Sequence, residues 1–139
     1  GFRVGYGFAH NNLISNLLKV KLPFEPSTLA QEAALGALDD DEFMQDSMRL
    51  NTEEKKLLYD FFTKHQINYI KSATNFITVI LRDEQENMNF CNKLLEQGVI
   101  IRNLKSFGLN NCARITIGTK EENEILKRSC LKMLEKNMV

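Results

Sequence analysis

Residues 98 to 118 read GVIIRNLKSFGLNNCARITIG, and this stretch decides the fold. Two runs rich in β-branched residues, 99–104 and 113–118, flank a segment of glycine and asparagine, which favour turns. Because alternate side chains of a strand share a face, the pattern predicts two β-strands joined by a loop. Each predicted strand carries one arginine, and these two side chains are the first candidates for a functional site.

The two arginines have different expected surroundings. Arg102 shares its predicted face with Ile100 and Leu104, whereas Arg114 lies on the polar side of its strand. A guanidinium buried without an anionic partner is costly. Two interpretations of Arg102 stay open. It is either a structural residue, in an ion pair or reaching solvent at a strand end, or part of a bidentate site for carboxylate or phosphate.

The elements around this stretch follow from apolar periodicity and helix caps. Together, the helices and strands expected from residue 41 onward predict an α+β domain, a sheet with helices packed on it. Its expected elements are a helix over 41–65, strands over 67–70 and 76–81, a helix over 85–97 with Met88, Cys91, Leu94 and Leu95 inward, the two arginine strands, and a helix opened by a Thr119 and Glu122 capping box.

The first 40 residues do not fit this pattern and are expected to be the end of another domain. GFRVGYGFA, residues 1–9, reads as a glycine-rich strand, and residues 10–21 have the spacing of a short amphipathic helix. LPFEPS then interrupts the helix, since each proline disfavours helix in the residue before it. Thr28 and Gln31 predict a capping box for an alanine-rich helix.

Composition excludes several classes of protein. The 139 residues include 18 basic and 18 acidic side chains, so no electrostatic footprint for nucleic acid or an anionic membrane is expected. No run approaches the 18 or so apolar residues of a membrane span. Three cysteines without close spacing, and two distant histidines, predict reduced thiols, no metal site and a cytoplasmic protein. His65 is interpreted as a helix-end residue rather than a catalytic base.

Five segments in order carry a resemblance to a known family. They resemble the C-terminal portion of fold-type I aminotransferases that depend on pyridoxal 5'-phosphate, above all the histidinol-phosphate aminotransferases. The similarity covers essentially the whole chain without large gaps. The segments are GFRVGYG (1–7), LAQEAALGALDDDEF (29–43), ATNF (73–76), GVIIRNL (98–104) and NCARITIGTKEEN (111–123).

The resemblance implies both a domain organisation and an activity. Residues 1–40 would end the large cofactor-binding domain, as a remnant strand and helices, and residues 41–139 would form the small C-terminal domain. The implied enzyme exchanges an amino group between histidinol phosphate or imidazole acetol phosphate and 2-oxoglutarate or glutamate, in histidine biosynthesis. A cytoplasmic homodimer is implied, and for this chain by itself a dimer or swapped assembly is expected.

The resemblance also assigns roles to single residues. Arg3 corresponds to an arginine that binds the cofactor phosphate, Arg102 to one that binds the substrate phosphate, and Arg114 to one that binds a substrate carboxylate. The Schiff-base lysine would lie before residue 1, so this chain holds no catalytic residue and is expected to be inactive by itself. Asn75 is interpreted as a turn residue, and Tyr6 as a packing or dimer contact.

Three alternatives stay open. Aromatic amino-acid aminotransferases and threonine-phosphate decarboxylases share the scaffold. A stand-alone anion-binding regulatory module would use the same two arginines for an effector. A plain interaction domain would use them in salt bridges.

Overall fold

The computed structural model describes residues 1–136, and the chain forms two units, Gly1–Gln45 and Asp46–Val139. The first unit contains two helices, α1 (Asn11–Val20) and α2 (Thr28–Leu38). The helix α3 (Asp41–Lys64) begins in this unit and continues into the second one. Within residues 1–136, no helix has the length and apolar character needed to cross a membrane.

Both helices of the first unit form where predicted, but the strand before them does not. Residues 1–10 have no regular secondary structure, so the prediction of a strand over 1–9 is wrong. A strand is stabilised by hydrogen bonds to a neighbouring strand, and the glycines of this segment add a cost in conformational entropy when a strand forms. The cap of α2 also differs by one residue, because the Ser27 hydroxyl, rather than Thr28, accepts from the Ala30 N–H at 3.2 Å.

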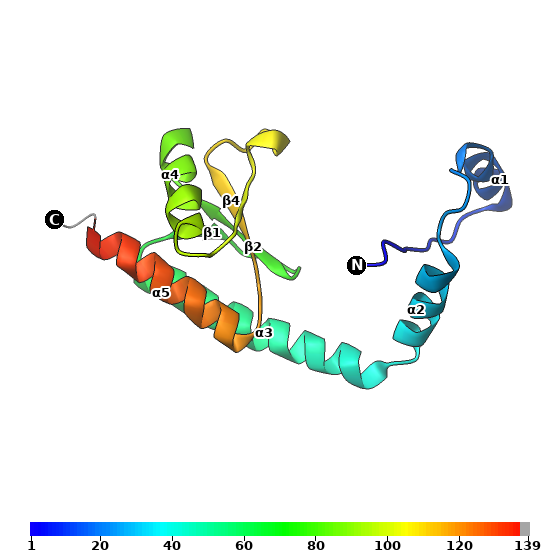
Figure 1. Ribbon diagram of the computed structural model, residues 1–139, viewed down its shortest axis with the longest axis horizontal. Coiled ribbons are helices and arrows are strands. Elements are labelled where there is room, and N and C mark those ends of the chain that lie inside the picture. The colour runs from blue at the N-terminus through cyan, green and yellow to red at the C-terminus, as the bar shows by residue number, and fades with distance from the viewer. Residues whose placement is uncertain (137–139) are drawn as a thin grey trace. The chain divides into compact units, whose positions relative to one another are not determined.

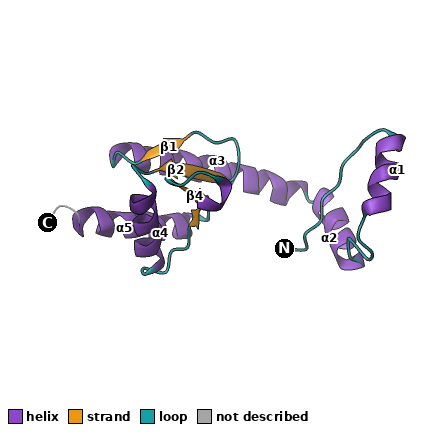
Figure 2. Ribbon diagram, turned by 90° about the horizontal axis from the view of Figure 1, so that it is seen from above, coloured by secondary structure: helices purple, strands orange, loops and turns teal. Residues whose placement is uncertain are grey.

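The second unit is the predicted α+β domain. After α3 come β1 (Asn68–Ile70), β2 (Phe76–Ile80), α4 (Glu84–Leu95), β3 (Arg102–Asn103), the 3-10 turn η1 (Lys105–Phe107), β4 (Cys112–Thr116) and α5 (Lys120–Lys136). Every neighbouring pair in the four-stranded sheet is antiparallel, in the order β1-β2-β4-β3. Figures 1 and 2 show β1, β2 and β4 together with α3, α4 and α5. The predicted order of elements from Asp41 onward is confirmed.

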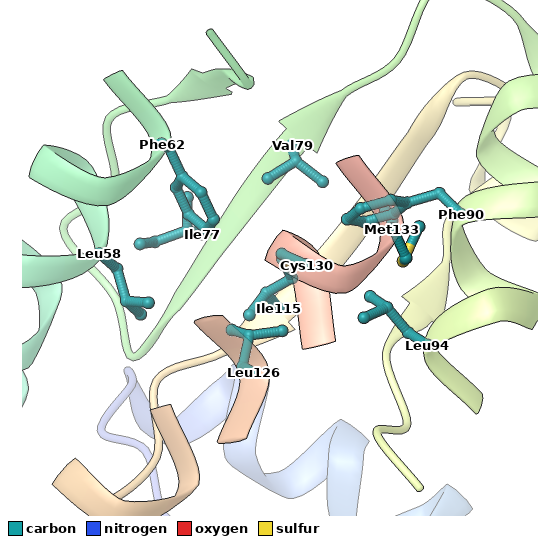
Figure 3. Packing of buried hydrophobic residues seen from close by; sticks show 11 residues of the cluster. Leu58, Phe62, Ile77, Val79, Phe90, Leu94, Ile115, Leu126, Cys130 and Met133 are labelled. Carbon is teal, nitrogen blue, oxygen red and sulfur yellow. The ribbon is translucent and has the colours of Figure 1, made fainter. Parts of the chain in front are cut away.

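One face of the sheet packs against three helices and forms the core (Figure 3). Alternate residues of the two central strands point into it, as the period of a strand requires. The inward strand residues are Ile77, Val79, Ala113 and Ile115, and the helices contribute Leu58 and Phe62 from α3, Phe90 and Leu94 from α4, and Leu126, Cys130 and Met133 from α5.

Local signals in the sequence end and begin the helices of this unit. Gly98 has φ +80°, a left-handed conformation that glycine adopts without strain, and it follows the end of α4. The capping box of α5 is confirmed by two reciprocal hydrogen bonds. The Thr119 N–H donates to Glu122 Oε2 at 2.8 Å, and the Glu122 N–H donates to Thr119 Oγ1 at 3.3 Å.

The buried side of α4 differs from the predicted one. Met88 is 41% exposed and Leu95 56% exposed, whereas Asn87 is fully buried. The Asn87 amide donates to the carbonyl oxygens of Asn110 and Cys112, both at 2.8 Å. The helix is therefore oriented partly by a polar anchor to the start of β4, and an apolar pattern cannot reveal such an anchor. Of the four residues predicted inward, Leu94 is buried and Cys91 half-buried.

Candidate anion-binding site

The sheet brings the two predicted arginines directly opposite each other. Arg102 of β3 is the register partner of Arg114 of β4, and Arg114 is in turn the partner of Thr78 of β2. Residues that are directly opposite in an antiparallel pair share a face, with Cβ atoms about 5 Å apart. The three side chains therefore form a row across the face opposite the core.

The surroundings of Arg102 differ from the prediction. The neighbouring Ile100 is 84% exposed and Arg102 is itself exposed, while Val99 and Ile101 pack against the core. The expectation that Arg102 lies on an apolar face is therefore wrong. Pairing with β4 turns the other side of this short strand inward, and Leu104 is buried only after the strand has ended.

Within residues 1–136, no carboxylate forms an ion pair with either arginine. The ion pairs within residues 1–136 lie elsewhere, and neither Arg102 nor Arg114 takes part in one. Arg114 Nε is buried without a hydrogen-bond partner. These observations do not support the interpretation of Arg102 as a residue of a structural ion pair. The two arginines are directly opposite in register, and within residues 1–136 neither charge is compensated by an ion pair, an arrangement that disfavours the sheet by itself.

Each guanidinium lies over a phenylalanine ring instead. Arg102 Cζ is 5.4 Å from the centre of the Phe107 ring, and Arg114 Cζ is 5.2 Å from the centre of the Phe76 ring. These distances are typical of cation–π contacts. Neither ring was singled out from the sequence. Alternation in β2 could have placed Phe76 beside Thr78, but the pairing of β2 with β4 was needed to bring both next to Arg114.

Hydrogen bonds fix the connection that carries Phe107. The Leu104 N–H donates to the Cys112 carbonyl at 3.0 Å, and the Lys105 N–H donates to Asn103 Oδ1 at 2.8 Å. The Lys105 ammonium also pairs with Glu84 Oε1 at 2.6 Å, which ties η1 to the start of α4. Phe107 is therefore presented by an ordered turn.

This row of side chains can bind an anion. Guanidinium groups present planar arrays of N–H donors that match the paired oxygens of carboxylate and phosphate. Here the two arginines are register partners on the face opposite the core, Arg102 is exposed and Arg114 half-buried, and neither forms an ion pair within residues 1–136. We therefore treat Arg102, Arg114 and Thr78 as the candidate anion-binding site.

The other residues singled out from the sequence lie away from this row. Arg3 belongs to the first unit, where it is exposed and has a left-handed φ of 56°. The Asn75 carbonyl accepts from the Ile117 N–H at 2.9 Å, in the bend before β2, in accord with its interpretation as a turn residue. Tyr6 is 74% exposed and makes an edge contact with Phe8. His65 packs against Phe61 at the end of α3.

A separate hollow of about 790 Å³ lies where α3 ends, beside β2, α4 and α5. Its lining includes His65, Arg82 and Cys130 but neither of the paired arginines. Burial raises the pKa of the Cys130 thiol to about 12, so this side chain stays a neutral, unreactive thiol at physiological pH. In the part of the chain that the structure describes, no group of three or more His, Cys, Asp or Glu could hold a metal ion.

Comparison with known proteins gives a consistent set of relatives. Residues 1–129 match the family described as aminotransferase class I and II. The chain is 49% identical over 124 residues to the histidinol-phosphate aminotransferase of Campylobacter jejuni subsp. jejuni serotype O:2, a match that covers 89% of this chain and 34% of that protein. It is 40% identical over 134 residues to that of Sulfurimonas denitrificans, covering 96% of this chain and 36% of that protein. The chain spans about a third of the length of these curated relatives.

Solved structures share the fold at low sequence identity. The histidinol-phosphate aminotransferase from Sinorhizobium meliloti in complex with pyridoxal-5'-phosphate matches with a TM-score of 0.76 and 22% identity, over 84% of this chain and 32% of that one. The aspartate aminotransferase of Thermotoga maritima matches with a TM-score of 0.64 and 20% identity, over 78% of this chain and 28% of that one. At such identities the likeness concerns the fold.

Proposed function

Because the chain belongs to the aminotransferase class I and II family, we propose that it works as the C-terminal part of a longer histidinol-phosphate aminotransferase. The reaction exchanges an amino group between histidinol phosphate or imidazole acetol phosphate and 2-oxoglutarate or glutamate, in histidine biosynthesis. One observation carries the proposal. Arg102 and Arg114 are register partners that form no ion pair within residues 1–136, in a chain that shares 49% identity with a protein of that name.

The two arginines bind the anionic ends of the substrates. Arg102 binds the phosphate of histidinol phosphate, and Arg114 binds a carboxylate of glutamate or 2-oxoglutarate. Since the two side chains are cross-strand partners, one small area accepts two chemically different substrates in turn. At an effective dielectric constant of about 20, one such contact gains on the order of 4 kcal/mol before desolvation is subtracted.

The cofactor of this enzyme is pyridoxal 5'-phosphate, and Arg3 binds its phosphate. Arg3 fits this role because its side chain is exposed and, within residues 1–136, forms no ion pair. The cofactor supplies an electron sink for the bond changes at the substrate carbon. Arg102 and Arg114 orient the substrate by its charged end. The Schiff-base lysine lies outside residues 1–139 in this proposal, so the chain by itself transfers no amino group.

We also propose a domain boundary, an assembly and a location. Residues 1–40 end the large domain, residues 41–139 form the small domain, and the enzyme is a cytoplasmic homodimer. Apolar side chains of the first unit support contacts beyond this unit, since contiguous exposed apolar surface favours association. The exposed apolar side chains there include Leu13, Leu17, Leu18 and Phe24.

The first experiment concerns the natural gene product. Its intact mass and its absorption spectrum in the range of pyridoxal phosphate adducts are recorded together. We expect a product about three times as long as this chain, with a cofactor band that changes when glutamate is added. A product no longer than 139 residues, without a cofactor band, would refute the proposal and leave a stand-alone anion-binding module.

A second experiment tests the arginine roles in that enzyme. Arg102→Ala is expected to raise the KM for histidinol phosphate more than the KM for glutamate. The matched control is Arg49→Ala, since Arg49 is an exposed arginine of α3 that pairs with Asp46 at 2.8 Å. Equal losses for both substrates would contradict the assignment of the phosphate to Arg102.

A further inference from the structure

The two rings at the arginine pair are not explained by the core. Phe107 is 62% exposed, and Phe76 is half-buried on the face opposite the core. Neither belongs to the buried cluster or to the residues packed against it. Outside the core, each ring contacts a guanidinium, at 5.4 Å for Phe107 and 5.2 Å for Phe76.

A ring and an anion use different parts of a guanidinium. The aromatic ring covers the flat face of the group, where the positive charge meets the negative face of the π system. The N–H donors lie in the guanidinium plane and point outward from its edge, where carboxylate or phosphate binds. A phenylalanine can thus hold an arginine in place while its donors stay available to a ligand.

A carboxylate partner would have the opposite effect. It would occupy the donors of the guanidinium and cancel the charge that attracts an anion. Arg102 and Arg114 have no such partner within residues 1–136, and Arg114 Nε has no hydrogen-bond acceptor. The rings therefore replace acidic side chains as the supports of this pair.

On the basis of the proposed function, we propose that Phe107 and Phe76 are positioning residues, which hold Arg102 and Arg114 beside each other so that the pair is preorganised for an anionic substrate group. Phe107 is suited to this role by its fixed backbone. The Lys105 ammonium on the same 3-10 turn pairs with Glu84 of α4, and the Lys105 N–H is bound by Asn103. Phe76 is held by the β2–β4 ladder.

The test uses the 139-residue chain and inorganic phosphate as the probe. NMR signals of the arginine Nε–H groups are followed during the titration, because they report on the two side chains themselves. Phe107→Leu keeps an apolar side chain but removes the π face, and the phosphate dissociation constant is expected to rise about 2- to 5-fold. Phe107→Trp offers a stronger π face and is expected to restore or tighten binding. Phe43→Leu is the control, an exposed phenylalanine of α3.

The outcomes separate the two proposals. If the unmodified chain binds phosphate and Phe107→Leu binds it equally well, the positioning role is wrong and the anion site stands. If phosphate leaves the Arg102 and Arg114 signals of the unmodified chain unchanged, the anion site itself is wrong and the role of the rings falls with it. Weaker binding by Phe107→Leu and recovery in Phe107→Trp, at an unchanged melting temperature, support the proposal.

Discussion

Replacing Arg114 by methionine should stabilise the fold and weaken anion binding at the same time. Arg114 faces the like charge of Arg102 directly across β3 and β4. Its Nε is buried without a partner, and its guanidinium contacts the Phe76 ring. Methionine has a similar length, carries no charge, and can still contact the ring through its sulfur.

The expected change in the free energy of unfolding follows from these three features of Arg114. Removing the like-charge pair gains about 0.5 kcal/mol. Removing a buried, unpaired donor gains about 1 kcal/mol, at the low end because Arg114 is only half-buried. The lost cation–π contact costs about 0.7 kcal/mol, part of which the sulfur–ring contact recovers. The net gain is about 1 kcal/mol, which corresponds to a rise of roughly 4–8 °C in the melting temperature.

Thermal unfolding followed by circular dichroism at low ionic strength measures this change. The part of the gain that comes from like-charge repulsion should shrink in high salt, where surface charges are screened. Phosphate at constant ionic strength should raise the melting temperature of Arg114→Met less than that of the unmodified chain, because a bound ligand stabilises in proportion to its affinity and one of the two guanidinium groups is gone. Arg49→Met is the control, since Arg49 belongs to an exposed ion pair worth at most about 1 kcal/mol.

A large loss of stability would refute the reasoning. Removing an arginine from a buried ion pair lowers the free energy of unfolding by about 3–5 kcal/mol, because its partner is left buried and unpaired. A melting temperature lowered by more than about 5 °C would therefore mean that Arg114 has a structural partner and that the uncompensated pair does not describe the folded chain.

Two further predictions concern the stability of the second unit. Asn123→Ala should lower the free energy of unfolding, measured by urea denaturation, by about 3 kcal/mol. The reason is that the Asn123 amide donates to buried Glu54 at 2.9 Å and to the Gly118 carbonyl at 3.0 Å. A loss below about 1 kcal/mol would contradict this prediction. Burial raises the pKa of Cys130 from 9.0 to about 12, so the folded state retains a proton that the unfolded state releases. The contribution of Cys130 to stability should be constant below about pH 9 and should fall as the pH rises toward about 12, at most by about 1.4 kcal/mol per pH unit. Cys130→Ala should therefore lose less stability over this range than the unmodified chain does.

Local signals predicted most elements of the second unit. The apolar spacing of α3 and α5, the Thr119 and Glu122 capping box, and Gly98 after α4 all concern residues within a few positions of one another. Such interactions are formed by neighbouring backbone groups, so their sequence patterns are informative without knowledge of the fold. The prediction of a strand over residues 1–9 was wrong because a strand is stabilised by hydrogen bonds to a partner strand, and the local sequence does not show whether such a partner is present.

The orientation of side chains was less predictable. For α4, Asn87 lies inside and Met88 outside because the Asn87 amide binds the carbonyls that precede and begin β4. Because those carbonyls are distant in sequence, the apolar pattern of α4 could not reveal this anchor. The predicted buried side of the helix was therefore shifted by about one residue from the observed one. For Arg102, alternation correctly paired it with Ile100 on one face but assigned that face to the core.

The sequence by itself determined the order of helices and strands from Asp41 onward, the capping box of α5, the resemblance to aminotransferases and the choice of Arg102 and Arg114 as functional candidates. Only the tertiary structure decided that these arginines are cross-strand partners, that no carboxylate of the described residues pairs with them, and that Phe76 and Phe107 lie under their guanidinium groups. The physical reason is strand register. It is set by packing and hydrogen bonds between distant segments, and shifting it by one residue would turn every side chain of β3 to the other face.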